Sequence, residues 1–91
     1  MDSNEQQIVE RARRDLAQRL GVSPTEIAGD AVEHAEFPDA ALGAPVEDEM
    51  SAQVITPGWR IRLTAEGQTY EYRANQKQLR LFNFNGENYR I

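Results

Sequence analysis

A β-hairpin is the feature that most constrains how this chain can fold. From Gly58 to Ala74 the sequence reads GWRIRLTAEGQTYEYRA, and apolar and polar residues alternate on both sides of Glu66-Gly67. Because successive side chains of a strand point to opposite faces, the alternation predicts an antiparallel pair with one buried face. Gly67 suits the positive φ that a two-residue turn needs. We therefore expect residues 58–74 to form the centre of a sheet.

The two-residue turn also sets the register of the hairpin. Counting outward from it, the expected pairs are Ala65–Gln68, Thr64–Thr69, Leu63–Tyr70, Arg62–Glu71, Ile61–Tyr72 and Arg60–Arg73. A slip by one residue would turn both tyrosines to the polar face. The Arg60–Arg73 pair brings two like charges together, which is unfavourable unless an acidic group lies nearby.

An amphipathic helix is expected at residues 4–20. Its apolar residues recur every four positions, at Ile8, Ala12, Leu16 and Leu20. Ser3 with Gln6 fits a capping box at the start of the helix, and Gly21 fits the residue that ends it. The segment Ser23-Pro24-Thr25-Glu26 is a second capping signal and predicts one short helical turn. We expect the apolar stripe of the helix to cover the buried face of the hairpin.

The remaining strands are less regular. Residues 31–37 predict a strand in which a bulge would let Val32 join Ala35 and Phe37 on the core side. Residues 38–51 form a long irregular segment, and such segments are often functional or disordered. Residues 52–56 predict a short strand that leads into Pro57-Gly58.

The C-terminal part predicts a strand at residues 79–84, with apolar residues on both faces. Leu79 and Leu81 share one side, and Phe82 and Phe84 are expected on the other. Asn85-Gly86 predicts a turn, after which residues 86–91 form either a strand that brings Tyr89 beside Phe82 or a tail. The fold class expected is α+β: one N-terminal amphipathic helix packed on one face of a three- to four-stranded antiparallel sheet. Residues 1–91 would form a single small domain.

Composition excludes several classes of function. The net charge is −5 and the pI is near 4.8, so we expect no binding to nucleic acid or to anionic membranes. The chain has no cysteine, and therefore no disulfide framework and no thiolate metal site. No apolar run approaches the length of a membrane span, and no signal-peptide core is visible, so we expect a cytoplasmic location.

Several candidate chemistries have a plainer structural interpretation. His34 would need acidic partners to hold a metal, and we expect it to be an exposed strand residue. The run Glu47-Asp48-Glu49 lacks the spacing of a calcium loop and is expected to be solvated. Trp59, Tyr70 and Tyr72 are expected in the core rather than on a base-stacking platform. No nucleophile–base pair or metal set is visible, so we expect neither an enzyme nor a bound cofactor.

Part of the chain resembles a family of small, uncharacterised bacterial domains. The family pattern runs W-P-D-x-x-L-G-C-P and then Q-x-x-x-P-G-Y-x-I-x-L-x-x-x-G-x-x-Y-x-Y-H. Here Phe37 to Pro45 and Gln53 to Tyr72 follow this pattern, and the segment Asp15 to Ile27 is also similar. The sequence departs from the pattern at Phe37 for Trp, Ala44 for Cys and Arg73 for His, which removes any thiol or imidazole chemistry that the pattern supports. The order of elements is also similar to that of PepSY-type domains, which occur in peptidase propeptides and are linked to inhibition.

The candidate binding surface is the sheet face away from the helix. It should carry a basic patch made of Arg60, Arg62, Arg73 and Arg80. Either the chain's own Glu47-Asp48-Glu49 or an external acidic peptide or protein surface would neutralise it, because arginine binds carboxylates well. We expect a small non-catalytic protein-binding, inhibitory or regulatory module, monomeric or weakly dimeric. The alternatives are a self-associating accessory domain and, least favoured, an enzyme with an unrecognised site. An exposed outer face on strand 79–84 would favour self-association.

Overall fold

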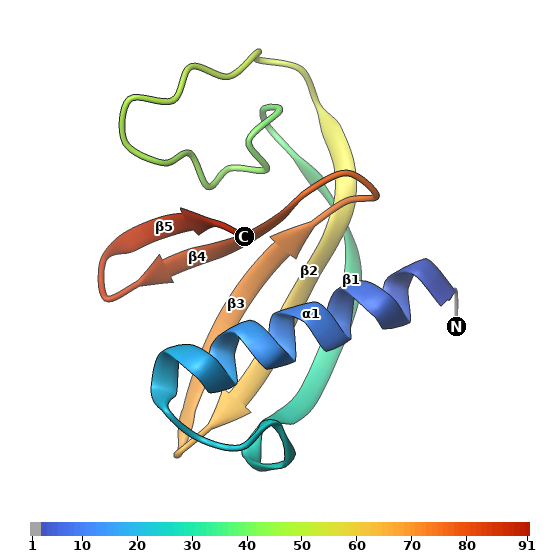
Figure 1. Ribbon diagram of the computed structural model, residues 1–91. Coiled ribbons are helices and arrows are strands. Elements are labelled where there is room, and N and C mark those ends of the chain that lie inside the picture. Colours follow the sequence, from blue (N-terminus) through green and yellow to red (C-terminus); the bar gives the residue numbers. More distant parts are fainter. Residues whose placement is uncertain (1–2) are drawn as a thin grey trace.

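The computed structural model describes residues 3–91, except for the side chains of Ser3, Asn4 and Asp30. Two helices are followed by strands that form a single antiparallel sheet in the order β1-β2-β3-β4-β5 (Figure 1). In chain order the elements are α1 (Ser3–Leu20), the 3-10 helix η1 (Pro24–Glu26), β1 (Ala28–Phe37), β2 (Thr56–Ala65), β3 (Gln68–Ala74), β4 (Leu79–Phe84) and β5 (Glu87–Arg90).

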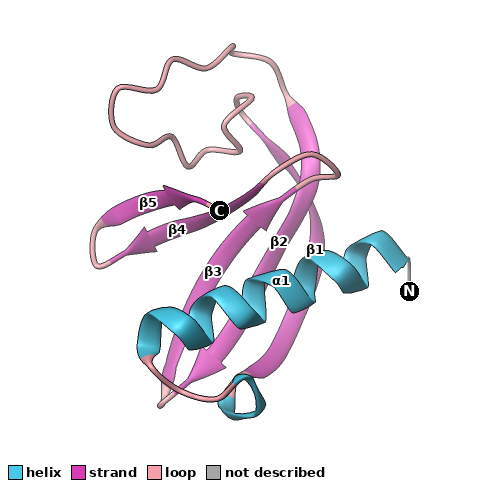
Figure 2. Cartoon of the chain, in the orientation of Figure 1, coloured by secondary structure: helices cyan, strands magenta, loops and turns pink. Residues whose placement is uncertain are grey.

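The expected α+β class is confirmed, with the helix against one face of an antiparallel sheet (Figure 2). The sheet is wider than the three or four strands expected. The added strand is β5, so residues 87–90 form a strand rather than a tail. Neither described helix combines the length and the apolar character that a membrane crossing requires.

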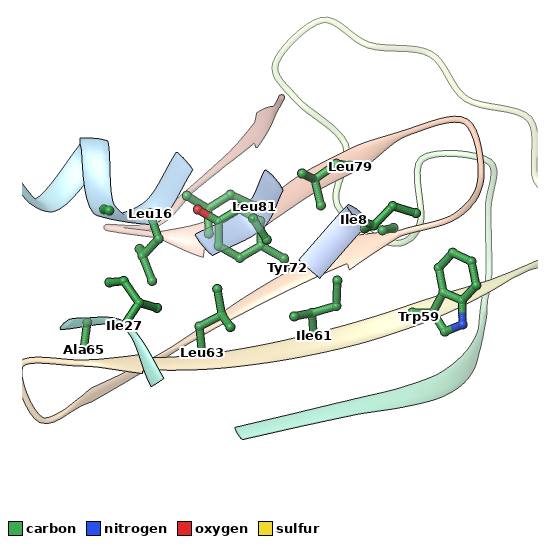
Figure 3. Packing of buried hydrophobic residues seen from close by; sticks show 13 residues of the cluster. Ile8, Leu16, Ile27, Trp59, Ile61, Leu63, Ala65, Tyr72, Leu79 and Leu81 are labelled. Carbon is green, nitrogen blue, oxygen red and sulfur yellow. The ribbon is translucent and has the colours of Figure 1, made fainter. Parts of the chain in front are cut away.

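The main core lies between α1 and the sheet. Leu16 and Ala12 of α1 are fully buried against Ile61, Leu63 and Tyr72 of the central strands (Figure 3). This packing confirms the predicted helix stripe, because Ile8 is buried as well and Leu20 lies at its margin. Each large aliphatic side chain that is fully buried contributes about 1.5–3 kcal/mol.

Both predicted helix boundaries after Leu20 are confirmed. Gly21 has φ +70°, and the Val22 amide donates to the Ala17 carbonyl at 3.0 Å, which is the Schellman pattern. Ser23 then caps η1, and its own amide donates to Glu26 Oε2 at 2.9 Å. The predicted cap at Ser3 depends on a side chain outside the described part of the chain.

The central hairpin has the predicted register at every pair, from Ala65–Gln68 out to Arg60–Arg73. Glu66 and Gly67 have φ values of 53° and 79°. Positive φ at both central residues is typical of a type I′ turn, which matches the twist of the flanking strands. The local turn chemistry therefore fixes which side chains of β2 and β3 face the helix.

The expected bulge in the first strand is wrong. The irregularity lies between Gly29 and Ala31, and from there β1 is regular. Val32 pairs with Ile61 on the helix side, whereas Phe37 pairs with Thr56 on the opposite face. Phe37 is nevertheless buried, because a second small core forms there beneath the segment between β1 and β2.

The expected strand at residues 52–56 is also wrong, since only Thr56 belongs to β2. Residues 38–55 therefore form one long connection, the green to yellow loop in Figure 1. The end of this loop is tied back to its start, where the Ala40 amide donates to the Ala52 carbonyl at 2.9 Å.

The two phenylalanines of β4 lie on different faces, contrary to the prediction from simple alternation. Asn83 has φ +54°, and the ladder between β4 and β5 shifts register between Leu81 and Phe84. This bulge turns Phe84 to the helix side, where its ring lies 5.8 Å from that of Tyr70, and leaves Phe82 on the far face. Tyr89 consequently pairs with Leu81 rather than lying beside Phe82.

Candidate functional site

The sheet face away from α1 carries all four arginines that the sequence singled out. Arg60 and Arg62 of β2 contact the same two carboxylates, one on each neighbouring strand. Arg60 pairs with Glu33 of β1 at 3.1 Å and with Glu71 of β3 at 3.3 Å. Arg62 contacts the same two carboxylates at 3.4 and 3.9 Å. The side chains of both arginines are partly exposed, at 29% and 41%.

Arg73 is enclosed more tightly than Arg60 or Arg62. Its guanidinium carbon lies 3.7 Å from the ring centroid of Phe82, and its Nε donates to Glu71 at 2.8 Å. Its Nη1 donates to the carbonyl oxygens of Leu42 and Gly43 at 3.1 and 3.0 Å. Arg73 therefore covers the outward-facing ring of β4 and holds the long loop at the same time.

Arg80 is buried, with only 3% of the residue exposed. It donates to both carboxylate oxygens of Glu49, at 2.6 and 2.7 Å, and to the Ala44 carbonyl at 3.2 Å. The hydrogen bonds from Arg80 lower the pKa of Glu49 from 4.5 to about 2, so this carboxylate stays charged. Two parallel bonds of this kind are the strongest geometry available to an arginine and a carboxylate.

The first part of the loop is built for these contacts. Asp39 Oδ1 accepts hydrogen bonds from the amides of Ala41 and Gly43, both at 2.9 Å, and folds the chain into a tight turn. Leu42, in the left-handed region at φ +58°, is fully buried in the second core with Ala41 and Ala44. Leu42 therefore anchors the loop to the protein.

These contacts give the arginines acidic partners within the chain. Glu71 lies between Arg60 and Arg73, which relieves the like-charge contact that the register imposes. Of the predicted acidic run, Glu49 reaches the face, whereas Glu47 and Asp48 are exposed. Binding of an external acidic partner by the four arginines stays a prediction, and Arg80 is enclosed beneath the loop rather than displayed on the surface.

The most exposed of the large apolar side chains lie outside this group of arginines, at the end of the same loop. Met50 is 97% exposed, Ile55 71% and Val54 56%. No charged residue occurs from Met50 to Thr56, although 27% of the whole chain is charged. We call Met50, Val54 and Ile55 the apolar ridge. The sequence reasoning missed this ridge because it assigned residues 52–56 to a strand, but the absence of charge was a usable signal.

A hollow adjoins the apolar ridge along the chain. Thr56 and Pro57 line the hollow and directly follow Ile55, and Trp59 lies further along the same strand. The wall on one side comes from β1, with His34 and Glu36, and the opposite wall is the β3–β4 turn with Lys77. We call this the terminal hollow, and Figure 3 shows Trp59 at the corresponding end of the core cluster.

The titratable groups near the hollow do not converge on a reactive centre. His34 is exposed, as predicted, and its ring centroid lies 6.4 Å from that of Trp59. Among the described residues no group of three or more His, Asp or Glu side chains could hold a metal ion. The predicted core role of the aromatic residues is confirmed for Trp59 and Tyr72, which are buried, and Tyr70 packs against the same cluster.

The fold and this surface define a small domain in which one helix covers one face of the sheet and a clamped loop covers part of the other. The chain belongs to a family of domains of unknown function, DUF8738, whose model matches residues 9–82. No curated protein and no solved structure matches the chain.

Proposed function

We propose that this domain is a small non-catalytic module that binds another protein through the apolar ridge and the terminal hollow beside it. The observation that carries the proposal is the exposure of Met50, Val54 and Ile55 within one uncharged run. Single exposed apolar residues are ordinary on a protein surface, but a group of them beside a concave surface is typical of an interaction site.

The way the rest of the surface is stabilised supports this choice of site. Phe82, the outward-facing ring of β4, is already covered by Arg73. The outer face of β4, which the sequence suggested as a surface for self-association, therefore contributes little to binding. Arg60 and Arg62 are held by Glu33 and Glu71, so an acidic partner would have to displace ion pairs in order to bind them. A partner that binds the apolar ridge does not have to displace these ion pairs.

An inhibitory or regulatory role is one form that protein binding can take here. The matched family assigns no activity, and the similarity of element order to PepSY-type domains is what favours inhibition. We identify the P-D-x-x-L-G segment of the resemblance with Pro38 to Gly43, whose contacts are structural: Asp39 shapes the turn and Leu42 fills the second core. The binding residues are accordingly sought outside this segment.

A site-specific crosslinking experiment tests the proposal. A photo-reactive residue is placed at Ile55 and, as a matched control, at Gln18, which is exposed on α1. After irradiation in extracts of the source cells, we expect protein conjugates from position 55 and none of the same mass from position 18. Equal labelling from both positions, or no conjugate from position 55, would show that the ridge is not a binding surface.

A further inference from the structure

We infer that the partner of the apolar ridge is a second copy of this chain, bound about a two-fold axis so that the ridge of each copy enters the terminal hollow of the other. This inference rests on the proposed function and names the occupant of the same site. Its first support is the arrangement of the surface, because exposed apolar side chains and a hollow follow each other along the chain. Ile55 belongs to the ridge, and Thr56, the next residue, lines the hollow.

A two-fold interface uses the same patch on both copies, so each contact occurs twice and the patch must complement itself. Pairing the ridge of each copy with the hollow of the other uses the same patch on both copies, as this condition requires. Ile55 directly precedes β2, and Pro57 and Trp59 of that strand line the hollow. An isoleucine entering a hollow formed by Pro57, Gly58 and Trp59 would exchange exposed apolar surface for apolar contact on both copies.

The charges of the patch are also self-complementary. The hollow contains one acidic and one basic side chain on opposite walls, Glu36 and Lys77. Neither makes an ion pair within the part of the chain that the structure describes. A two-fold axis would bring Glu36 of one copy toward Lys77 of the other, twice. The uncharged run of residues 50–56 leaves no like charges to meet near the axis, although each copy carries a net charge of −5.

The free sheet edges are weaker candidates for self-association. β1 is the longer edge strand, but it carries Glu33 and Glu36. Pairing two copies along this edge would bring their carboxylates together, and charged edge strands are a common protection against such pairing. β5 has only four residues. The hollow differs from this edge because it also contains Lys77, which balances the charge of Glu36.

Sedimentation equilibrium of the purified full chain tests the inference. We expect reversible association between monomer and dimer over concentrations from about 5 μM to about 1 mM. Trp59 is the chain's single tryptophan and lines the hollow, so its fluorescence emission should change over the same concentration range. Ile55→Lys should raise the dissociation constant at least about tenfold. Thr69→Lys, an exposed position near the far hairpin turn, should leave it unchanged.

A charge-reversal pair tests the geometry. Glu36→Lys and Lys77→Glu should each weaken the dimer, and the double variant should restore association because the cross-copy pairs form again with exchanged signs. Far-ultraviolet circular dichroism confirms that every variant is folded. A monomer at all concentrations, a dimer indifferent to Ile55→Lys, or a double variant no better than either single variant would overturn the inference. Protein binding at the ridge is judged separately, because conjugates to other proteins from position 55 in the extract would persist when the purified chain is monomeric.

Discussion

The hydroxyl of Tyr72 donates a hydrogen bond to Asp15 Oδ2 at 2.7 Å, across the boundary between β3 and α1. The same carboxylate oxygen accepts from Arg19 Nε at 2.7 Å. Tyr72 is fully buried, and burial together with the hydrogen bond to Asp15 raises the pKa of its hydroxyl. Residues 57 positions apart thus form one polar contact inside the helix–sheet core, and they lie in two of the three segments that carry the family resemblance.

The hydrogen bond between Tyr72 and Asp15 predicts that substituting the two residues lowers the free energy of unfolding by different amounts. Tyr72→Phe should lower the free energy of unfolding by about 0.5–1.5 kcal/mol, because Asp15 keeps Arg19 as a partner. Asp15→Ala should cost about 1–3 kcal/mol, because it leaves a buried hydroxyl without an acceptor. Urea denaturation of both variants and of the double variant measures the coupling between them. We expect the double variant to cost less than the sum, and additive costs would show that the contact contributes nothing.

The helix stripe predicts a larger effect at its centre. Leu16→Ala should lower the free energy of unfolding by about 2–5 kcal/mol, because Leu16 is fully buried and its truncation leaves a cavity. Gln18→Ala, two residues further on and exposed, should change stability by no more than about 0.5 kcal/mol. Thermal and urea unfolding of the two variants under the same conditions check this difference. Similar values for both would mean that α1 does not pack as the structure has it.

Much of this fold follows from local patterns in the sequence. The alternation of residues 58–74 and the Glu66-Gly67 turn suffice to predict all pairs of the central hairpin, because turn geometry and side-chain period leave no freedom in register. The four-residue recurrence from Ile8 to Leu20 likewise predicts the buried side of α1. These features depend on neighbours that are close in sequence.

The errors arise where distant parts of the chain decide the outcome. Phe37 was expected on the core side with Val32, by means of a bulge, but the loop supplies a second core on the opposite face. The turn of Phe84 toward the helix depends on a positive φ at Asn83, a conformation that asparagine tolerates and a count of parity ignores. The contact between Arg80 and Glu49 spans 31 residues, so the sequence could offer the acidic run only as one of two possible partners.

A substitution at Gly58 tests how closely β2 and β3 approach each other. A Cβ atom placed there would lie 2.3 Å from the Ala74 carbonyl oxygen and 3.2 Å from the Phe37 ring. Gly58→Ala should therefore destabilise the protein by about 1–3 kcal/mol, because β2 or β3 has to move. Gly86→Ala is the matched control, since its φ is +86° and nothing lies within 4 Å of its Cβ position. That control isolates the cost of the left-handed backbone, about 1–2 kcal/mol. Amide shifts should move in β3 for Gly58→Ala alone, and undisturbed β3 amides in that variant would contradict the close approach.

The ion pair between Glu49 and Arg80 predicts a dependence of stability on pH. The pKa of Glu49 is about 2 in the folded protein, below its usual value of 4.5, so its charged form stabilises the fold above pH 4.5. This contribution is lost progressively as the pH falls from 4.5 to about 2, as protons bind first to the unfolded chain and then to the folded one. Glu49→Gln should accordingly be less stable than the original protein near pH 7, and the difference should shrink across this window.

Glu47→Gln is the matched control for this titration, because Glu47 belongs to the same acidic run but is exposed. Its difference from the original protein should stay near zero, within about 0.5 kcal/mol, from pH 7 to pH 2. Glu49→Ala should cost about 3–5 kcal/mol near pH 7, because it leaves the guanidinium of Arg80 buried with no carboxylate beside it. Urea unfolding at a series of pH values measures all three variants. A stability difference for Glu49→Gln that does not change between pH 5 and pH 2 would show that this carboxylate does not hold the loop.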